Sequence, residues 1–436
     1  MPKSINFLKF IIFFTKVFAI LVLFIFGIWA IWEFPQQQVQ PLKQQIDILK
    51  RSKADPKDIA TQLKGRIEVE NTTRNGAIQA IGGLLVFVTL YISWQNLKVT
   101  EAKQVAERFS KAVEQLGSEN IHTRLGGIYA LEQIAKDAEE KYYRQVMETL
   151  SAYVREKSPF PSLESQEKTQ GTEDIPRLPT DIQAVMTVLS RRKYSHNNGE
   201  DYRLDLRKTD LRGLQLLAGA KLQGVNFQEA CLEKAILQEA KLQGAWFAKA
   251  DLQGVNLSNA KLQEVDLRQT DLKGGKFKQA NLQRADLSMA NLQGADFTQA
   301  NMQQAHLTGA NLQGACFDKA NLQRAHLEGV NCQLNNVNPH LLVVSVYFGE
   351  ADLQEAVLTE ANLYKAIITD AHLKSAVLTK VNLEQAVLKG SDFKKADFTN
   401  VIGLTWEQLQ QADSYEGALL PDYLFRNNQP LQQRET

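Results

Sequence analysis

The chain has 436 residues, enough for two or three folded domains, and its 44% apolar and 23% charged content is ordinary for a folded protein. The formal net charge of +1 excludes a general electrostatic attraction to nucleic acid or to anionic membranes. Three cysteines, at positions 231, 316 and 332, are too few and too scattered for a disulfide framework or a zinc site, and unpaired thiols favour a reducing compartment.

The first predicted element is an apolar run over residues 10–32, interrupted only by Thr15 and Lys16. As a helix, a run of this length crosses a hydrocarbon core of about 30 Å. A cleaved signal peptide is the alternative, because Lys3 and Lys9 precede the run. However, the run is long for a signal peptide, and no small-x-small cleavage site follows it. Residues 1–34 are therefore predicted to form an N-terminal anchor with a transmembrane helix.

A second apolar run, residues 77–94, predicts a second transmembrane helix over 76–95. Tyr91 and Trp94 at its end suit a membrane interface, whereas a buried helix of a soluble protein is the alternative. Two spans would place both chain ends on one side of the membrane. The connecting segment, 35–75, is as rich in Lys and Arg as the flanks, so the positive-inside rule does not decide the orientation.

Residues 96–157 show apolar stripes at helical spacing and predict a small α-helical module. Gly117 is expected to end its first helix. A linker rich in Pro, Ser and Glu follows over 158–178, and then a helix over 179–194. This helix begins with a predicted capping box, in which Thr180 is the N-cap and Gln183 the N3 residue.

One motif in the helical module, Arg124-Leu-Gly-Gly127, raises the question of an anion site. Its glycines could expose backbone amides to a phosphate, or they could let two helices approach closely. No strand precedes the motif, and the chain has no phosphate-binding Gly-x-x-x-x-Gly-Lys-Ser/Thr pattern at this point. Close helix packing is therefore the favoured interpretation.

From residue 217 onward the chain repeats with a period of five. Nearly every fifth residue is Leu, Phe or Met, and a small residue stands two places before it, as in Ala240 and Leu242. Residues two apart in extended backbone point the same way, so both face inward, while the polar positions face water or form a corner. A chain that turns every five residues closes a square coil in about twenty, and such coils stack through backbone hydrogen bonds.

Outward residues twenty apart are predicted to line up on neighbouring coils. Ladders of amide side chains reinforce such stacking. One predicted ladder consists of glutamines and another of asparagines: Gln223, Gln243, Gln263, Gln283, Gln303 and Gln323 in the first, and Asn281, Asn301 and Asn321 in the second.

The repeat of a small residue, Asp or Asn, Leu or Phe and two looser positions, as in Ala-Asn-Leu-Gln-Gly at 290–294, resembles the pentapeptide-repeat family over residues 203–400. This resemblance implies a mainly β fold, a right-handed quadrilateral β-helix. The segments at 107–117 and 124–132, followed by Thr180-Asp-Ile-Gln-Ala, resemble the helical module that precedes the repeats in membrane-anchored bacterial members, which are frequent in cyanobacteria. That second resemblance implies that 76–95 is a true span.

Two regions depart from the regular frame. Residues 335–350 absorb a one-residue shift and are expected to form either a bulged coil or a short helix. After residue 400 the sequence Thr405-Trp-Glu-Gln is a second capping box, which predicts a C-terminal helical cap over 401–427 that covers the open end of the stack. A tail, 428–436, completes the chain.

No catalytic, cofactor-binding or metal site is expected, and no cofactor. His306 and His326 stand twenty apart, so they would stack on neighbouring coils, with Cys316 between them in sequence but on a different face. A two-histidine metal site is the alternative to an ordinary solvated surface.

The sequence predicts a non-enzymatic scaffold, an integral two-pass membrane protein whose repeat domain is cytoplasmic. Its partners would be membrane lipid, through the two spans, and a protein of unknown identity; a homo-oligomer is compatible with the sequence, and nucleic acid is not expected. An accessory role in membrane transport or envelope assembly is the alternative. Mimicry of DNA towards topoisomerases, known for some members of the family, requires an acidic face, whereas residues 203–400 carry 22 Lys and Arg against 21 Asp and Glu.

Overall fold

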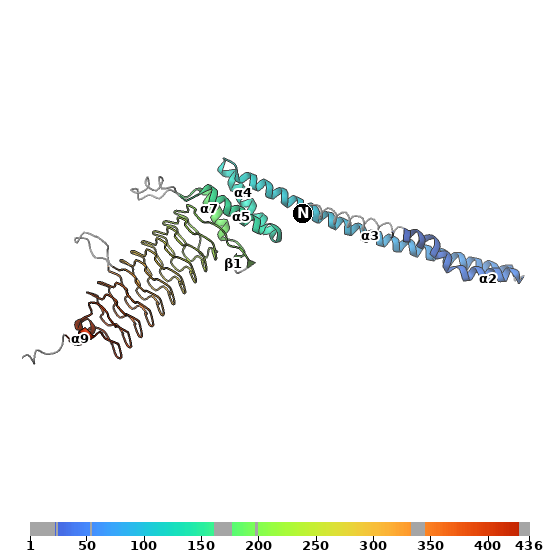
Figure 1. Cartoon of the computed structure of the whole chain (residues 1–436). Helices are drawn as coiled ribbons and strands as arrows, with labels where there is room; N and C mark the ends of the chain where they lie inside the picture. Colours follow the sequence, from blue (N-terminus) through green and yellow to red (C-terminus); the bar gives the residue numbers. More distant parts are fainter. Residues whose placement is uncertain are drawn as a thin grey trace, which may run out of the picture. The chain divides into compact units, whose positions relative to one another are not determined.

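The structure is a computed structural model, and it describes residue 22 and residues 25–52, 55–160, 177–196, 199–332 and 345–426. The chain divides into two compact units, residues 1–104 and 105–436 (Figure 1). Most of the predicted first span, most of the predicted linker and most of the irregular segment 335–350, with its predicted bulged coil or short helix, lie outside the described residues.

The first unit is an antiparallel pair of helices. Residues 25–38 are helical and lead into α2 (Gln40–Arg51), and the chain then returns along α3 (Pro56–Leu116). Gln36 Nε2 donates to Glu70 Oε1 at 2.8 Å, and Gly27 faces Ile81, so residues far apart in sequence lie side by side in antiparallel order. The segment that connects the two apolar runs is thus itself helical.

Within the described residues, one helix, α3, is long and apolar enough to cross a membrane, and its apolar stretch is not covered by other parts of the chain. The large side chains of this stretch are exposed: Leu84, Leu85, Val86, Phe87, Leu90, Tyr91, Ile92 and Trp94. Exposed apolar side chains at such density are unusual on a protein surface that faces water.

The second unit begins with a bundle of four helical segments: the end of α3 from residue 105, α4 (Ile121–Asp137), α5 (Glu139–Lys157) and α7 (Thr180–Ser190). Their apolar stripes bury Leu131, Val146 and Leu189. Gly127 has a packing role, because a Cβ there would lie 2.7 Å from the carbonyl oxygen of Ala112. The interpretation of the two-glycine motif as a close helix contact is confirmed for this glycine.

The predicted capping box at the start of α7 is wrong. The N-cap residue is Pro179, and no side chain caps the helix. Gln183 Nε2 instead donates to the carbonyl oxygen of Gln215, and the backbone N–H of Gln215 donates to Gln183 Oε1. These two hydrogen bonds connect α7 to the first coil of the repeat region. A short parallel pair, β1 (Ser195–His196) with β2 (Gly199–Glu200), completes the junction.

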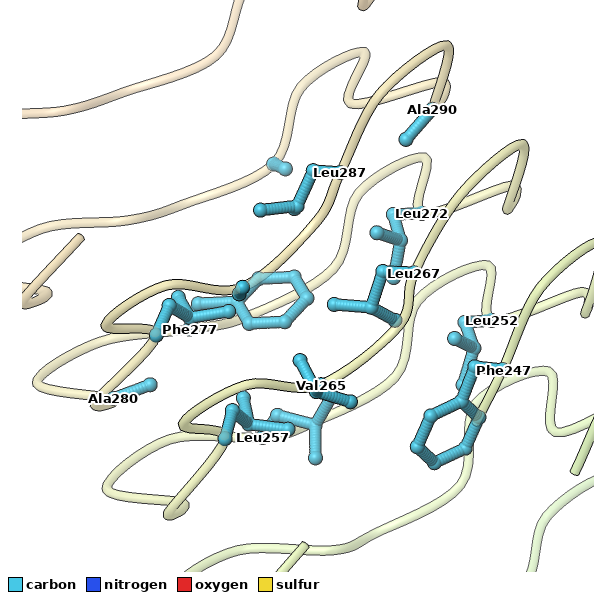
Figure 2. Packing of buried hydrophobic residues seen from close by; sticks show 14 of the residues in the cluster. Phe247, Leu252, Leu257, Val265, Leu267, Leu272, Phe277, Ala280, Leu287 and Ala290 are labelled. Carbon is cyan, nitrogen blue, oxygen red and sulfur yellow. The ribbon is translucent and has the colours of Figure 1, made fainter. Parts of the chain in front are cut away.

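From residue 204 the chain winds into a stack of square coils. Outward positions pair through parallel β-bridges with positions 21 residues later in the first coil, as Asp205 with Asn226, and 20 residues later in most of the stack, as Lys241 with Lys261. The sides of each coil are too short to form extended strands, so the pairing in this region consists of single bridges. The small and large residues of the repeat fill the inside, as Figure 2 shows for Ala290 and its neighbours.

The coil corners contain a feature that the sequence pattern did not reveal. One residue at nearly every corner adopts a left-handed backbone conformation, with φ between 51° and 61° when it is not glycine, and many of these residues are Lys, Glu, Gln or Arg. Such a conformation costs non-glycine residues about 1–2 kcal/mol each. The buried interior and the backbone ladders must offset this cost at every turn.

The phenylalanines also form a column inside the stack. Phe277, Phe297, Phe317 and Phe348 lie one above another, with ring centroids 4.6 Å, 5.0 Å and 5.1 Å apart and nearly parallel planes. Offset parallel stacking adds about 0.5–1.5 kcal/mol per pair beyond the burial of area. The column therefore links four successive coils.

Two parts of the repeat region differ from a uniform stack. Cys316 pairs with Tyr347, 31 residues later instead of 20, so this interval of the chain is eleven residues longer than a regular coil. At the C-terminal end the capping box of Thr405 and Gln408 is confirmed, but its helix, α8 (Trp406–Gln410), is only five residues long. The chain then forms another partial coil, in which Ser414 and Leu419 pair with the preceding coil, before α9 (Asp422–Arg426).

Gly403, at one corner of this end, gives a first test of the packing. It has φ +73°, and an added Cβ would lie 2.7 Å from the Cα of Glu384. Gly403→Ala is expected to lower the free energy of unfolding by about 2–3 kcal/mol, from backbone strain and this collision. Gly274→Ala is the matched control: its φ is +66° with no atom within 4 Å, and it should lose about 1 kcal/mol. Equal losses in denaturant titrations would contradict the collision.

Candidate functional site

The outward residues form four flat faces, each a ladder of bridged positions. We define them by their first and last bridged residues: the first face runs from Lys221 to Ser414, the second from Asp205 to Leu419, the third from Asp210 to Ile402 and the fourth from Gln215 to Val387. The first and third faces are opposite sides of the square coil. Because the inner residues pack against one another, the residues of the solenoid that are available to contact a partner lie on its outer faces.

The predicted glutamine ladder exists, but its lower half, Gln223 to Gln263, differs from its upper half, Gln283 to Gln323. In the upper half Gln283 Nε2 donates to Gln303 Oε1 at 2.9 Å, and Gln303 Nε2 to Gln323 Oε1 at 3.0 Å. In the lower half the Oε1 atoms are buried and have no hydrogen-bond partner among the described residues: those of Gln223, Gln243 and Gln263. The two halves also differ in the first-face residue that stands two positions before each glutamine. This residue is lysine before Gln223, Gln243 and Gln263, and asparagine before Gln283, Gln303 and Gln323.

The upper half of the ladder lines a polar groove of about 560 Å³ at the corner of the first face. Its side chains are linked from coil to coil: Arg284 Nε donates to Gln304 Oε1 at 3.0 Å, and Arg324 Nε to Glu355 Oε2 at 2.7 Å. The lining residues are Gln263, Glu264, Gln283, Arg284, Gln303, Gln304, Gln323, Arg324, Gln354 and Glu355. The groove thus presents a regular, mutually supported array of amide, guanidinium and carboxylate groups.

The two histidines stack as predicted. The rings of His306 and His326 are parallel within 1°, with centroids 4.7 Å apart, and they lie on the second face. Cys316 lies on the fourth face, between Asp296 and Tyr347, so it does not join them. In the part of the chain that the structure describes, no group of three or more His, Cys, Asp or Glu side chains is placed to hold a metal ion.

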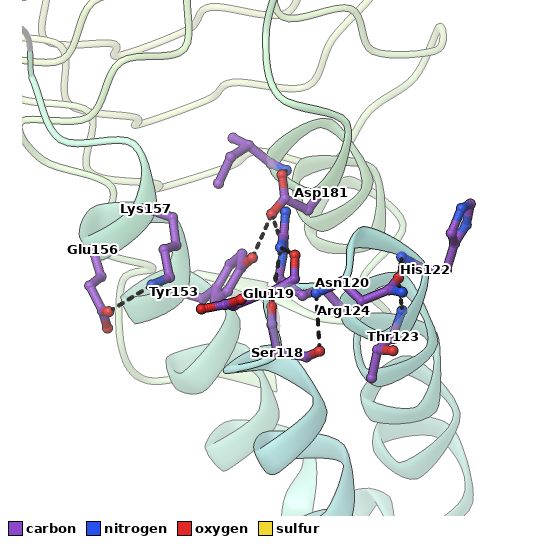
Figure 3. Close-up of polar contacts among 11 residues, drawn as sticks. Ser118, Glu119, Asn120, His122, Thr123, Arg124, Tyr153, Glu156, Lys157 and Asp181 are labelled. Atoms are coloured by element: carbon purple, nitrogen blue, oxygen red, sulfur yellow. Dashed lines mark hydrogen bonds and ion pairs between the residues drawn. The ribbon is translucent and has the colours of Figure 1, made fainter.

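Arg124, from the two-glycine motif, belongs to a buried polar cluster at the ends of four helical segments (Figure 3). Its Nε donates to Asp181 Oδ2 at 2.8 Å, and its Nη1 donates to the carbonyl oxygens of Ser118 and Glu119. Tyr153 also donates to Asp181, at 2.6 Å. The Arg124 guanidinium therefore donates its hydrogen bonds to groups of this chain, although it borders a cavity of about 320 Å³.

Protonation of Asp181 couples this cluster to stability. Burial alone would raise the pKa of Asp181, but the hydrogen bonds from Tyr153 and Arg124 outweigh burial and lower it. A lowered pKa in the folded state stabilises the fold above the ordinary pKa of about 3.9, and this stabilisation is lost as the pH falls through the folded-state pKa.

Asp181→Asn is expected to lower the free energy of unfolding at pH 7 by about 2 kcal/mol, because the charged hydrogen bonds are lost. The difference from the unchanged chain should shrink as the pH falls below about 4. Asp137→Asn, which removes an exposed ion pair to Arg108, is the control and should cost under about 1 kcal/mol. An Asp181→Asn cost that is independent of pH in thermal melts would contradict the role of the charge.

The cysteine thiols are poor nucleophiles. Burial raises the pKa of Cys231 to about 12, and it also raises the pKa values of Cys316 and Cys332. A reactive cysteine needs a lowered pKa and access to solvent. The thiols therefore act as small apolar groups.

Sequence reasoning missed a buried ion pair at the junction of helices and coils. Arg192 Nε lies 3.7 Å from Glu200 Oε1, with both side chains about 1% exposed, and Tyr143 donates to the same oxygen at 2.9 Å. Burial lowers the pKa of Arg192. Nothing in the polar stretch around these residues distinguishes them from a solvated loop, so the sequence carried no signal.

The stack of square coils defines a quadrilateral β-solenoid. A family model described as pentapeptide repeats matches the chain repeatedly, and the matched residues are 203–238, 216–254, 235–274, 250–288, 290–329, 345–379 and 366–402. The chain belongs to the pentapeptide repeat family through this region. The predicted family is confirmed.

Solved structures that resemble this chain include pentapeptide repeat proteins and a fluoroquinolone resistance protein. HetL, involved in heterocyst differentiation regulation in the cyanobacterium Nostoc sp. strain PCC 7120, is 27% identical over 51% of this chain and 89% of that chain, with a TM-score of 0.20. QnrB1, a plasmid-mediated fluoroquinolone resistance protein, is 18% identical over 48% and 95%, with a TM-score of 0.29.

Rfr23, from the cyanobacterium Cyanothece 51142, is 27% identical over 29% of this chain and 85% of that chain, with a TM-score of 0.17. No curated protein matches the chain. Membership of the family therefore rests on the repeats themselves.

Proposed function

We propose that the chain is a non-enzymatic scaffold, anchored in a membrane by two helices, whose β-solenoid binds a protein partner. The observation that carries this proposal is the polar groove of the first face, because its side chains are held in a fixed array by bonds between coils. A surface that is ordered before binding loses less entropy when a partner docks.

Membrane anchorage is supported by paired aromatic and cationic side chains at the two ends of the apolar stretch. At one end Lys98 Nζ lies 3.8 Å from the ring centroid of Trp94, and at the other the Arg74 guanidinium lies 5.7 Å from that of Trp32. Tryptophan and cations gather at membrane interfaces. Arg74 and Trp94 are twenty residues apart on α3, which is about 30 Å and matches a hydrocarbon core.

The same pairing favours two spans. Trp32 ends the first apolar run, and it lies at the level of Arg74, where the second run begins. Two antiparallel spans would therefore enter and leave the membrane at matching heights, and the solenoid would stand on the side of the chain's N-terminus. Together with the buried thiols, this arrangement suits a cytoplasmic repeat domain.

A groove variant tests the scaffold. The double substitution Arg284→Ala and Arg324→Ala removes two exposed groove cations, and it is expected to weaken capture of the partner by the full-length chain from solubilised membranes at least ten-fold. Lys319→Ala with Lys380→Ala is the matched control, because it also removes two ion pairs between coils, to Glu350 and Glu360, away from the groove. Equal capture by both variants would contradict a role for the groove.

One observation favours the second candidate function, an accessory role in membrane transport or envelope assembly. The pair formed by α2 and the start of α3 lies beyond the apolar stretch, at the end away from Trp94, with Ile48 and Ile67 exposed. In that case partners would contact the spans or this helical pair, and the groove variant would capture them as well as the unchanged chain does.

A further inference from the structure

The first three coils carry an unusual stack of like charges. Lys221, Lys241 and Lys261 are bridged neighbours on the first face, so their side chains leave adjacent coils in line. Like charges directly opposite each other on neighbouring strands destabilise a sheet. Within the described ranges no ion pair or side-chain hydrogen bond is recorded for these lysines. In the next three coils the same position is asparagine, which carries no charge.

The opposite face of the same coils carries the complementary charge. Asp251 and Asp271 are bridged neighbours on the third face, directly across the coil from Lys241 and Lys261. Both accept backbone hydrogen bonds, at 3.1 Å from Gln253 and Lys273, but neither has an ion pair among the described residues. Burial, and then the nearby charges of Asp271 and Glu233, raise the pKa of Asp251.

We propose that the first face of one copy packs against the third face of a second copy, with Lys241 and Lys261 of one chain at the level of Asp251 and Asp271 of the next. The partner is thus another copy of this chain in parallel orientation. The inference rests on the proposed function in one respect: copies anchored in one membrane carry their solenoids on the same side, so side-by-side packing at equal height is the arrangement open to them.

The remaining residues of the two faces are compatible with this packing. In these coils the first face has three lysines against one glutamate, Glu264, and the third face has three carboxylates against two lysines, Lys234 and Lys273. The flexible four-carbon stem of lysine lets its ammonium group reach a carboxylate on a facing ladder. Above the charged coils asparagine meets asparagine, at Asn281 with Asn291 and at the following coils. The contact joins two different faces, so it continues from copy to copy in a row.

Charge reversal gives a direct test. One variant carries Lys241→Asp and Lys261→Asp, and a second carries Asp251→Lys and Asp271→Lys. Each position accepts the new residue, because Asp and Lys both occur at bridged positions of this stack. Full-length chains in detergent are compared by sedimentation. The unchanged chain is expected to self-associate, and each variant alone should lose at least ten-fold in association, because both of its faces then carry the same charge.

The decisive sample is the mixture of the two variants. Each face of one variant then meets the opposite charge on the other, so the mixture should regain the association of the unchanged chain. The control Lys249→Asp with Lys276→Asp makes the same charge change on the second and fourth faces, and should associate normally. A mixture that stays monomeric while the single variants remain folded by circular dichroism would overturn the proposal.

Failure of this proposal can be told apart from failure of the proposed function. Alkaline extraction of membranes reports whether the chain is an integral membrane protein, and it does not depend on contacts between copies. Self-association in detergent likewise needs no membrane. If the chain resists extraction but the mixture shows no rescue, the proposed contact between copies is wrong and the proposed membrane anchor stands.

Discussion

Replacing Ala290 by aspartate is expected to lower the free energy of unfolding by about 4–5 kcal/mol or more, which is exceptional for one substitution. Ala290 is 1% exposed and points into the coil between Leu287 and Leu292, as Figure 2 shows for Leu287. A carboxylate there would be desolvated without a partner, and it would also exceed the space of a methyl group. Because each coil supports the next, the damage should extend to the coils on both sides.

The matched control is Asn281→Asp, in the same coil. Position 281 faces outward and is bridged to Lys261 and Asn301, so the new carboxylate has no like charge beside it. This control introduces the same charge and should change the free energy of unfolding by less than about 1 kcal/mol. Denaturant titrations would show the difference, and similar losses for the two variants would contradict the assignment of the inner wall.

Placing two arginines in the apolar stretch of α3 is expected to abolish the second span. Leu85 and Phe87 are 60% and 74% exposed, in the stretch that we propose to face lipid. Each arginine at the centre of a span costs about 2.5–3.5 kcal/mol for membrane insertion, so Leu85→Arg with Phe87→Arg costs about 5–7 kcal/mol. The first span would still anchor the chain, but the solenoid would move to the other side of the membrane.

The readout is a reporter at the C-terminus whose signal depends on the compartment. Ile48→Arg with Ile67→Arg is the control, because these side chains are also exposed, at 65% and 56%, but lie outside the apolar stretch. The control should leave the reporter where it is. A reporter that also stays in place for the Leu85 and Phe87 variant would contradict two spans.

The repeat region was predictable because its physics is local. A small and a large inner residue in every five positions predict the square coil, its length of about twenty residues and the ladders of outward residues. The bridges from Lys221 to Lys241 and from Asn281 to Asn301 confirm the spacing of twenty. The corner conformation was not predictable, since Lys, Glu and Gln rarely adopt positive φ. Only the stacked coils on either side make that conformation acceptable.

The contacts that distinguish this chain were the least predictable. Gln183 resembled a helix cap, but the backbone of Gln215, 32 residues away, binds its side chain. The buried pair of Arg192 and Glu200 likewise depends on how the bundle meets the first coil. The groove could be anticipated only as a row of glutamines, because the links through Arg284 and Arg324 depend on which residues face each other across coils.

Photo-crosslinking in native membranes tests the central claim most directly. A photoreactive residue is placed in full-length chains either at Gln304, in the groove, or at Phe87, in the apolar stretch. The account predicts adducts with a protein of another sequence at Gln304 and adducts with lipid at Phe87. Protein adducts at Phe87 with none at Gln304 would contradict a scaffold whose solenoid binds the partner.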